Sequence, residues 1–392
     1  MRSSVPAPPP RDVRLDVVRG WLQLTIFFSH ATASFAGTWL VYGHYGFSDS
    51  SEQFVFLSGL ALGSVFARNA VREGALAAWR DMLRRTLRLY RTHLITFACF
   101  GAMMAAAEFV LPGEAQRLGW GFLMHHPLQA AATSLTLLYQ PEPMGILPVF
   151  IWCMLLLPGF ELLQRRFGEA ALLAPVALYG LAQVTGWTAP SLGPETGIPF
   201  NPFEWQLIFL LGAWIGRRRL LRGRALPQSD LITVAAAAVV LFALAARLAD
   251  RGVIPWPVID SFAWDDKEDL VLTRLAHAMA LAWLVARFMP RDAAWMHRFA
   301  GRVLAAIGRH SLQVFCVGLF LSWAATAAFR LWPAQMPWVD PLMIAGGSVV
   351  LAALAWRLDR PLRRSTARRN AAAPAESPIR AGMTVRGEGA VP

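Results

Sequence analysis

Apolar segments of roughly membrane-spanning length recur along almost the whole chain, and they constrain its fold more than any other feature. A helix needs about 20 predominantly apolar residues to cross the hydrocarbon core of a bilayer. Hydrophobic residues make up 56% of the sequence and charged residues only 16%, so we predict an all-α polytopic membrane protein of about ten transmembrane helices. The expected spans are approximately residues 18–41, 51–68, 91–111, 143–163, 170–187, 204–216, 230–248, 269–289, 303–329 and 337–357. The short segment 204–216 has to extend at one end or be re-entrant.

Arginine follows this pattern of spans, so the formal net charge of +12 does not indicate a nucleic-acid partner. The lead before the first expected span and every second connection after it are rich in arginine, whereas the alternate connections hold few basic residues. Arginine-rich connections stay in the cytoplasm, so we predict that both termini are cytoplasmic. The basic residues on the sparse side are Arg117, Arg247, Arg251, Lys267 and Arg330.

The expected membrane domain occupies residues 11–364. A Pro-rich lead (1–10) and a tail rich in Ala, Pro, Gly, Ser and charge (365–392, expected in the cytoplasm) are predicted to be disordered. The 3 cysteines lie in apolar runs without paired spacing, so we expect neither a disulfide framework nor a metal site. Any activity is therefore expected to be built from helices and their connections.

The first expected span carries a polar stripe. Arg19 and His30 are eleven residues apart, about three helical turns, so they share one face roughly 16 Å apart along the axis. Asp16, Gln23 and Ser34 fall near the same stripe. Ionisable groups inside a bilayer cost about 2.5–3.5 kcal/mol each on insertion scales, so this face is predicted to line a functional interior.

Two further polar pairs open expected spans on the non-cytoplasmic side. Asp49 and Glu52 are three residues apart, which fits a capping box with Asp49 as N-cap and fits equally well a substrate-binding or acid–base role. Arg274 and His277 lie about one to two turns inside the eighth expected span. An arginine that only anchors a helix stands at the membrane boundary, so Arg274 is expected to point inward to a carboxylate or a substrate.

The segment RRTLRLYRTHLITF enters the third expected span from the cytoplasm. The simpler interpretation is a basic flank that fixes the orientation of the helix. The alternative is that its side chains hold phosphates of a nucleotide-bearing donor or of lipid head groups. The residues concerned are Arg84, Arg85, Arg88, Arg91 and His93.

Gly59 and Gly63 form a small-xxx-small pair in the second expected span. Such a pair allows two helix backbones to approach closely. We therefore expect a helix-packing face there rather than a ligand site.

The chain contains in this order the segments RDVRLDVVRGWLQLTIFFSH, GFSDSSEQFVFLSG, RRTLRLYRTHL, ILPVFIWCMLLLP, FNPFEWQLIFLLG, DDKEDLVLTRLAH and GRHSLQVFCVG. Together, from about residue 11 to about residue 360, they resemble the OpgC family, membrane proteins linked to succinylation of osmoregulated periplasmic glucans. That family is similar to the wider acyltransferase-3 group, whose hallmark is an Arg, ten residues and a His. Arg19 and His30 match this spacing.

The resemblance implies a multi-pass protein of the bacterial inner membrane with ten spans. It implies transfer of an acyl group, succinyl from succinyl-CoA, to a glucan hydroxyl across the membrane. Acyl-CoA is then a co-substrate, and no tightly bound cofactor is expected. In the family an acidic residue often precedes the ILP segment, where this chain has Gly145. Glu142 is the residue that could replace it.

For such a reaction we expect His30 to act as the general base on the glucan hydroxyl, with a covalent acyl-histidine as the alternative. Arg19 is expected to hold the donor, and Asp16 to orient Arg19. The expected acceptor-binding or oxyanion-stabilising residues are Asp49, Glu52, Arg274 and His277. The expected donor-phosphate contacts are Arg85, Arg88 and Arg91.

Two other classes of protein fit part of this pattern. A transporter or flippase for a glycan or an acidic metabolite would also place ionisable residues on several spans without a soluble domain. It would need no acyl-CoA and would leave the mass of the glycan unchanged. A structural or sensory membrane protein is the third class, but it would leave the cost of the buried polar stripe unexplained.

Overall fold

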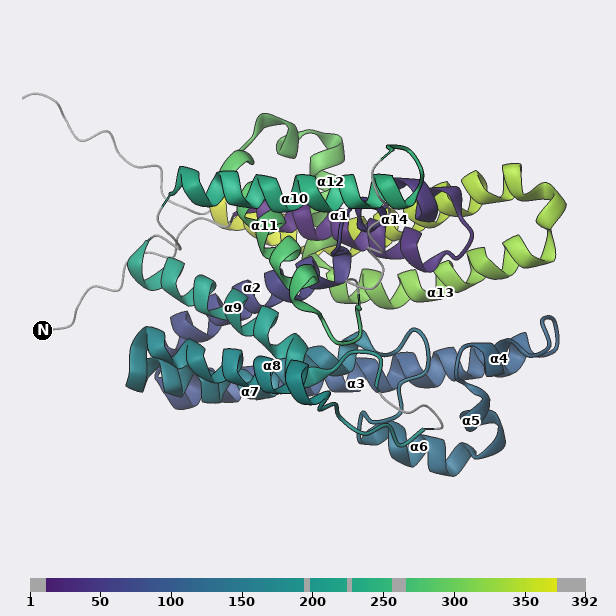
Figure 1. Cartoon of the computed structure of the whole chain (residues 1–392), viewed down its shortest axis with the longest axis horizontal. Coiled ribbons are helices and arrows are strands. Elements are labelled where there is room, and N and C mark those ends of the chain that lie inside the picture. Colours follow the sequence, from purple (N-terminus) through teal and green to yellow (C-terminus); the bar gives the residue numbers. More distant parts are fainter. Residues whose placement is uncertain (1–11, 194–197, 224–227, 256–265, 372–392) are drawn as a thin grey trace, which may run out of the picture.

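The computed structural model describes residues 12–193, 198–223, 228–255 and 266–371, which contain helices and turns and no β-strand. Most helices run near the long axis of the molecule (Figure 1). The long helices are α1 (Val13–His30), α2 (Ser50–Glu73), α3 (Ala75–Ala107), α7 (Ile146–Phe167), α8 (Leu173–Thr185), α9 (Pro202–Arg222), α10 (Asp230–Asp250), α11 (Leu272–Phe288), α12 (Phe299–Arg309), α13 (Ser311–Leu331) and α14 (Met336–Ala371). Shorter elements are α4 (Glu114–Arg117), α5 (Gly121–His125), α6 (Pro127–Leu135), a π-helical turn (Ala36–Leu40) and 3-10 turns at Tyr42–Tyr45, Gly168–Leu172, Ala294–His297 and Pro333–Gln335.

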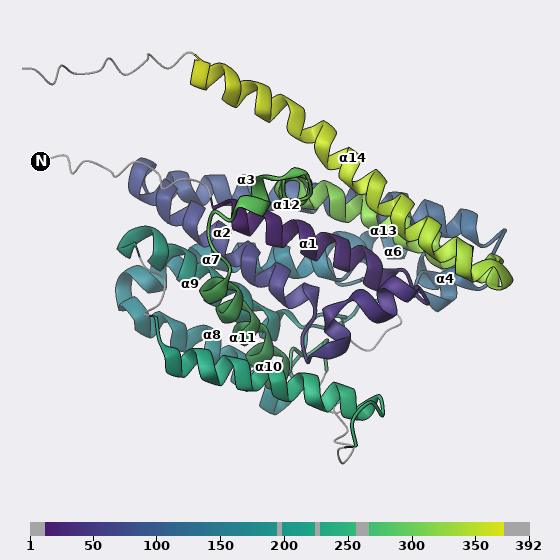
Figure 2. The same ribbon diagram turned by 90° about the horizontal axis from the view of Figure 1, so that it is seen from above.

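Within the described ranges, 5 helical segments are long and apolar enough to cross a membrane: α2, residues 146–185, α10, α13 and residues 333–360. In α10 and in the segment that includes α14, only 22% of the apolar window is buried. These two helices lie at opposite edges of the bundle (Figure 2). Soluble monomers rarely expose apolar surfaces of such extent, so the outward faces indicate a membrane protein.

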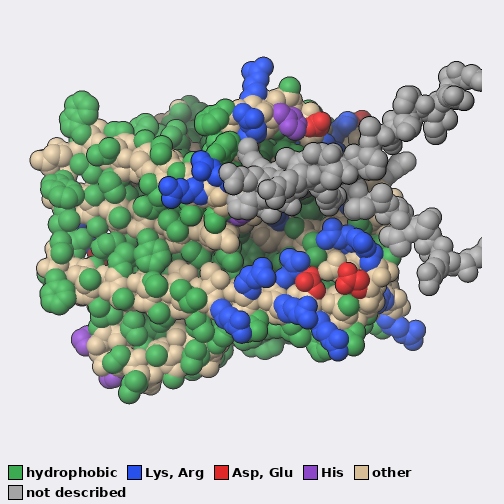
Figure 3. Space-filling view, turned by 180° about the vertical axis from the view of Figure 1, so that it is seen from behind, with side chains coloured by type: hydrophobic (Ala, Val, Ile, Leu, Met, Phe, Trp, Pro, Cys, Tyr) green, Lys and Arg blue, Asp and Glu red, His purple; other side chains and the backbone are tan. Residues whose placement is uncertain are grey.

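The surface separates apolar from basic side chains. On the face shown in Figure 3, hydrophobic side chains cover one half and most of the Lys and Arg side chains gather over the other. This separation agrees with the alternation of arginine along the sequence. The number of ten spans and the cytoplasmic position of both termini stay predictions.

Helix boundaries differ from the expected spans at both ends of the domain. The first expected span ends early, because α1 stops at His30 and Ala33 takes a left-handed φ of 74°. The hydroxyl of Ser34 then accepts a hydrogen bond from the backbone N–H of Ala36 at 3.1 Å, which starts a separate turn. The ninth expected span is broken at His310 into α12 and α13.

Other expected segments are extended in the structure. The short segment 204–216 is the central part of α9, which extends to Arg222. Residues 365–371 of the expected disordered tail are the last turns of α14. The rest of that tail and the expected N-terminal lead lie outside the described residues.

Glycines allow a close helix crossing between α2 and α9. A Cβ at Gly59 would overlap the carbonyl oxygen of Phe209, and one at Gly63 would overlap that of Ala213. The contact is reciprocal, because Gly212 and Gly216 of α9 face backbone carbonyls of α2 in the same way. The predicted helix-packing face is confirmed. Glycines also allow the backbones of α1 and α12 to approach closely, because a Cβ at Gly20 or Gly308 would meet a backbone carbonyl of the other helix.

This crossing gives a first testable expectation. Replacing Gly212 by leucine forces a side chain into the backbone of α2, so the free energy of unfolding should fall by about 1–3 kcal/mol or more. Replacing Gly180 of α8 by leucine is the matched control, because nothing lies within 4 Å of a Cβ there. Unfolding by denaturing detergent measures both variants. Equal losses in the two would contradict close packing at the α2–α9 crossing.

Candidate active site

The last turn of α1 fixes the ring of His30 in one orientation. Its Nδ1 lies 2.8 Å from the carbonyl oxygen of Ile26. A carbonyl oxygen only accepts hydrogen bonds, so Nδ1 carries the proton and, in the neutral imidazole, Nε2 carries the lone pair. Residue His30 as a whole is partly exposed. His30 therefore presents a basic nitrogen at the end of a buried helix.

Polar contacts hold α1 against α2, which runs in the opposite direction. The hydroxyls of Thr25 and Ser50 are 2.6 Å apart, near the end of the bundle where α1 ends and α2 begins. This end is called the His30 end below. Deeper in the bundle, Nη2 of Arg19 donates to the carbonyl oxygen of Leu57 at 2.6 Å. The Arg19 part of the stripe thus faces α2, whereas Ser34, after the end of α1, donates to Oδ1 of Asp340 in α14 at 2.7 Å.

Asp16, one turn before Arg19, is buried with 4% of its surface exposed. Its backbone carbonyl lies against Gly308 of α12. The crossing with α12 thus removes this part of the stripe from the surface.

An ion cluster joins the start of α2 to the start of α11. Asp49 caps α2 by accepting from the backbone N–H of Ser51 at 2.7 Å, and Glu52 accepts from the backbone N–H of Asp49 at 2.9 Å. The expected capping box is therefore present. Arg274 donates through Nε to Oε1 of Glu52 at 2.7 Å, so it points inward to a carboxylate, as predicted.

Asp49 extends the cluster outward. Its Oδ2 lies 2.8 Å from Nζ of Lys267 and 3.4 Å from Nη2 of Arg274. Its side chain is 25% exposed, whereas that of Glu52 is fully buried. The contact between Thr25 and Ser50 places the last turns of α1, and with them His30, beside the start of α2 where this cluster lies.

His277 lies one turn after Arg274 and is almost completely buried, with 2% exposure. Its Nδ1 accepts from the backbone N–H of Ser48 at 3.2 Å and lies 2.7 Å from the Ser48 hydroxyl. The Nε2 atom therefore carries the proton. Gly46 is required beside the ring, because a Cβ there would overlap it.

The arginines of α3 do not join this cluster. Arg85, Arg88 and Arg91 lie in the first half of α3, which begins at the end of α2 opposite Asp49, and all three are exposed. Arg85 pairs with Asp81 at 2.9 Å. His93, by contrast, is fully buried and packs near Phe97, with ring centroids 6.4 Å apart. The structure thus separates the expected donor-phosphate residues from the expected acceptor-binding residues.

Sequence reasoning missed several members of the His30 end. Lys267 is paired with Asp49, and Ser48 holds His277. Arg247 donates to the carbonyl oxygen of Gly46 at 3.2 Å. Lys267 and Arg247 could have been predicted from the sequence, because both are basic residues on connections that need no basic residue to set the membrane orientation.

A family model described as OpgC protein matches residues 11–362. The chain belongs to the OpgC family. Membership implies an acyltransferase-type enzyme that modifies a glucan. No curated protein and no solved structure matches this OpgC chain.

Gly145, where relatives of this OpgC chain are expected to carry an acidic residue, has little free space around it. A Cβ there would lie 2.9 Å from the ring of Phe200 and 3.1 Å from Pro199. Glu142 is exposed, and its carbonyl oxygen accepts from Nε1 of Trp120 at 2.7 Å. A longer side chain at position 145 would displace Phe200, and a compensating role for Glu142 stays a prediction.

Proposed function

We propose that this chain is an integral membrane O-acyltransferase of the acyltransferase-3 group. It would move a succinyl group from cytoplasmic succinyl-CoA to hydroxyls of a periplasmic glucan, from a ten-span position in the bacterial inner membrane with both termini in the cytoplasm. The observation that carries this proposal is the orientation of His30. Its Nδ1–H donates to the carbonyl oxygen of Ile26, which leaves Nε2 as the basic nitrogen, and His30 ends α1 at the end of the bundle where the ion cluster lies.

In the proposed reaction Nε2 of His30 takes the proton of a glucan hydroxyl while the hydroxyl oxygen attacks the thioester carbonyl. The carbon–sulfur bond breaks and coenzyme A leaves as the thiolate, which takes up a proton. The alternative route begins with attack of Nε2 itself on the carbonyl, and the glucan hydroxyl then displaces the imidazole. Both routes use the same nitrogen.

In this proposal the residues of the ion cluster have different roles. Both oxygens of Glu52 are already engaged, by Arg274 and by the backbone of Asp49, so Glu52 positions Arg274. Asp49 is partly exposed and contacts the acceptor. The Nε2–H of His277 and the guanidinium of Arg274 supply hydrogen-bond donors for an acceptor oxygen or the developing oxyanion.

The donor side of the proposal uses the opposite part of α1. Arg19 lies about 16 Å from His30 along the helix and holds the donor, and the buried Asp16 orients it. The exposed Arg85, Arg88 and Arg91 of α3 bind the phosphates of coenzyme A. This separation fits a donor and an acceptor that arrive from opposite sides of a membrane.

The purified protein tests this function directly. With a glucan oligosaccharide present, succinyl-CoA should be consumed and free thiol released, and without the oligosaccharide release should be much slower. Acetyl-CoA in parallel reactions measures selectivity for the acyl group. Transfer of acetyl but not succinyl would revise the donor, and no glucan-dependent thiol release from either donor would contradict the enzyme.

A further inference from the structure

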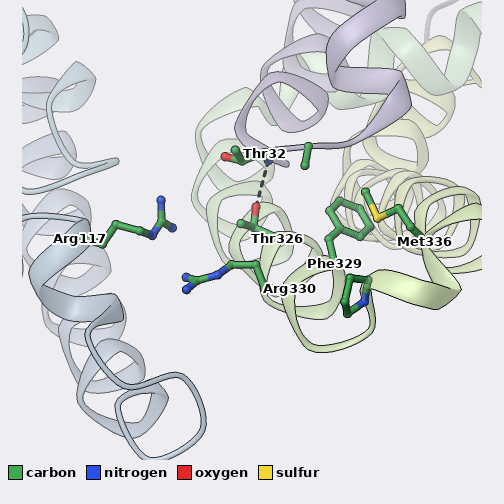
Figure 4. A pocket seen from close by; sticks show the side chains of 8 residues that line it. Thr32, Arg117, Thr326, Phe329, Arg330 and Met336 are labelled. Atoms are coloured by element: carbon green, nitrogen blue, oxygen red, sulfur yellow. Dashed lines mark hydrogen bonds between the residues drawn. The ribbon is translucent and has the colours of Figure 1, made fainter.

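A cavity of about 480 Å³ opens at the His30 end, beside the turn that follows α1 (Figure 4). Thr32 and Thr326 form one wall, where the backbone N–H of Thr32 donates to the Thr326 hydroxyl at 3.0 Å. The same hydroxyl lies 3.5 Å from the carbonyl oxygen of His30. The wall of the cavity is therefore continuous with the last turn of α1.

Two arginines from different helices reach this cavity. Arg117 of α4 and Arg330 of α13 point toward each other from opposite sides (Figure 4). Among the described residues that line the cavity there is no carboxylate. We call this site, defined by Arg117, Arg330, Thr32 and Thr326, the arginine pocket.

A single buried carboxylate holds both arginines. Arg117 donates to Glu114 through Nε at 3.0 Å and through Nη2 at 2.7 Å, and Arg330 donates to the same side chain through Nη1. Trp323 adds a fourth bond, at 3.2 Å. The hydrogen bond from Arg117 lowers the pKa of Glu114 below its usual value, so the carboxylate is ionised.

The N–H donors of the two arginines are only partly used. Glu114 is the carboxylate bonded to both guanidinium groups, and the charge of Glu142 also acts on Arg117. Glu114 is fully buried, whereas the side chains of Arg117 and Arg330 are 44% and 43% exposed. Each guanidinium has five N–H donors, so donors remain for a ligand. A contact that only fastened α4 to α13 would need one arginine.

Membrane orientation does not account for these arginines either. Both belong to the connections that are otherwise poor in arginine. Arginine matches the geometry of carboxylate and phosphate oxygens better than lysine does. We infer that the arginine pocket binds an anionic oxygen group, a carboxylate or a phosphate, on the substrate that meets His30.

This inference rests on the proposed function for the identity of the substrate, and two parts of that substrate carry such a group. One is an anionic substituent already present on the acceptor glucan. The other is the free carboxylate of the succinyl group while it is transferred. Both bring the same chemistry to the same arginines.

Binding to the purified full-length protein tests the pocket without any need for catalysis. The probes are a neutral glucan oligosaccharide and the same oligosaccharide carrying a succinyl half-ester. We expect the anionic probe to bind at least about tenfold more tightly at low salt, since charge-assisted hydrogen bonds to arginine are strong. Arg330→Gln and Arg117→Gln should each abolish this preference and leave the affinity for the neutral probe unchanged.

The matched control is Arg251→Gln, because Arg251 lies over the rings of Trp39 and Tyr45 and does not line the pocket. It should change neither affinity. Arg330→Lys keeps the charge but loses the planar fork, so it should retain part of the preference, and it replaces the glutamine variant if that variant fails to fold. No preference in the wild type, or an equal loss for both probes in the pocket variants, would overturn the inference.

Transfer assays then distinguish the two sources of the anion. If the pocket holds the acyl carboxylate, Arg330→Gln should slow succinyl transfer and spare acetyl transfer to a neutral acceptor. If it holds a substituent of the glucan, the variant should raise KM for the anionic acceptor with either donor. Absence of transfer in the wild type would contradict the proposed function, whereas the binding measurements would still decide the pocket.

Discussion

Replacing His30 by glutamine is expected to lower the rate of glucan acylation by about 10²–10⁴-fold. Glutamine keeps a polar side chain of similar length, but it has no nitrogen that accepts a proton near neutral pH. The loss should fall on kcat rather than on KM, because the imidazole acts on the hydroxyl during the transfer itself. Steady-state assays with succinyl-CoA and a glucan oligosaccharide measure both constants.

The control for this variant is His125→Gln, at an exposed histidine of α5, which should leave both constants near the wild-type values. A His30→Gln protein that folds and acylates glucan at the full rate would contradict the assigned base. Rapid quenching without acceptor separates the two routes. A succinylated His30 that accumulates and then disappears when glucan is added would favour the covalent route.

Removing Glu52, the carboxylate partner of the buried Arg274, is expected to give the largest loss of stability. Glu52→Ala leaves the side chain of Arg274, 5% exposed, without its nearest carboxylate and α2 without its capping box. Breaking a buried ion pair from one side costs about 3–5 kcal/mol. Titration of the purified protein with denaturing detergent measures the change in the free energy of unfolding.

An exposed ion pair provides the comparison. Asp230 and Arg287 are 3.2 Å apart, with 92% and 33% of their side chains exposed, so Asp230→Ala should cost about 0–1 kcal/mol. The double variant Glu52→Gln with Arg274→Met removes both charges and should recover much of the loss seen in Glu52→Ala. A loss in Glu52→Ala no larger than in Asp230→Ala would show that the buried pair does not hold α2 to α11.

The sequence predicted the helical class well because apolar length is a local property. The polar stripe of α1, the capping box and the glycine face of α2 depend on residues within a few turns of one another. The structure places the stripe from Asp16 to His30 in α1 and the box and the glycines at the start of α2 and within it, whereas Ser34 lies after the end of α1. The early end of α1 was harder to predict. Most residues after His30 are still apolar or small, and the left-handed turn at Ala33 leaves no composition signal.

Pairings between distant helices were only partly predictable. The inward direction of Arg274 followed from its depth in the expected span, but its partner Glu52 lies far away in the sequence. The contact of Glu114 with its two arginines was even harder to predict from the sequence than the pairing of Arg274 with Glu52. Only the position of Arg117 and Arg330 on arginine-poor connections set them apart, and their convergence depends on how α4 packs beside α13.

The mass of periplasmic glucans from cells that carry or lack this chain tests the central claim most directly. The account predicts that glucans from cells with the chain carry additional succinyl groups, and that this mass increase disappears when the chain is absent or when His30 is replaced by glutamine in a protein that still inserts into the membrane. Identical glucan masses in all three strains would contradict the acyltransferase and would favour a transporter, which moves a glycan without changing its mass.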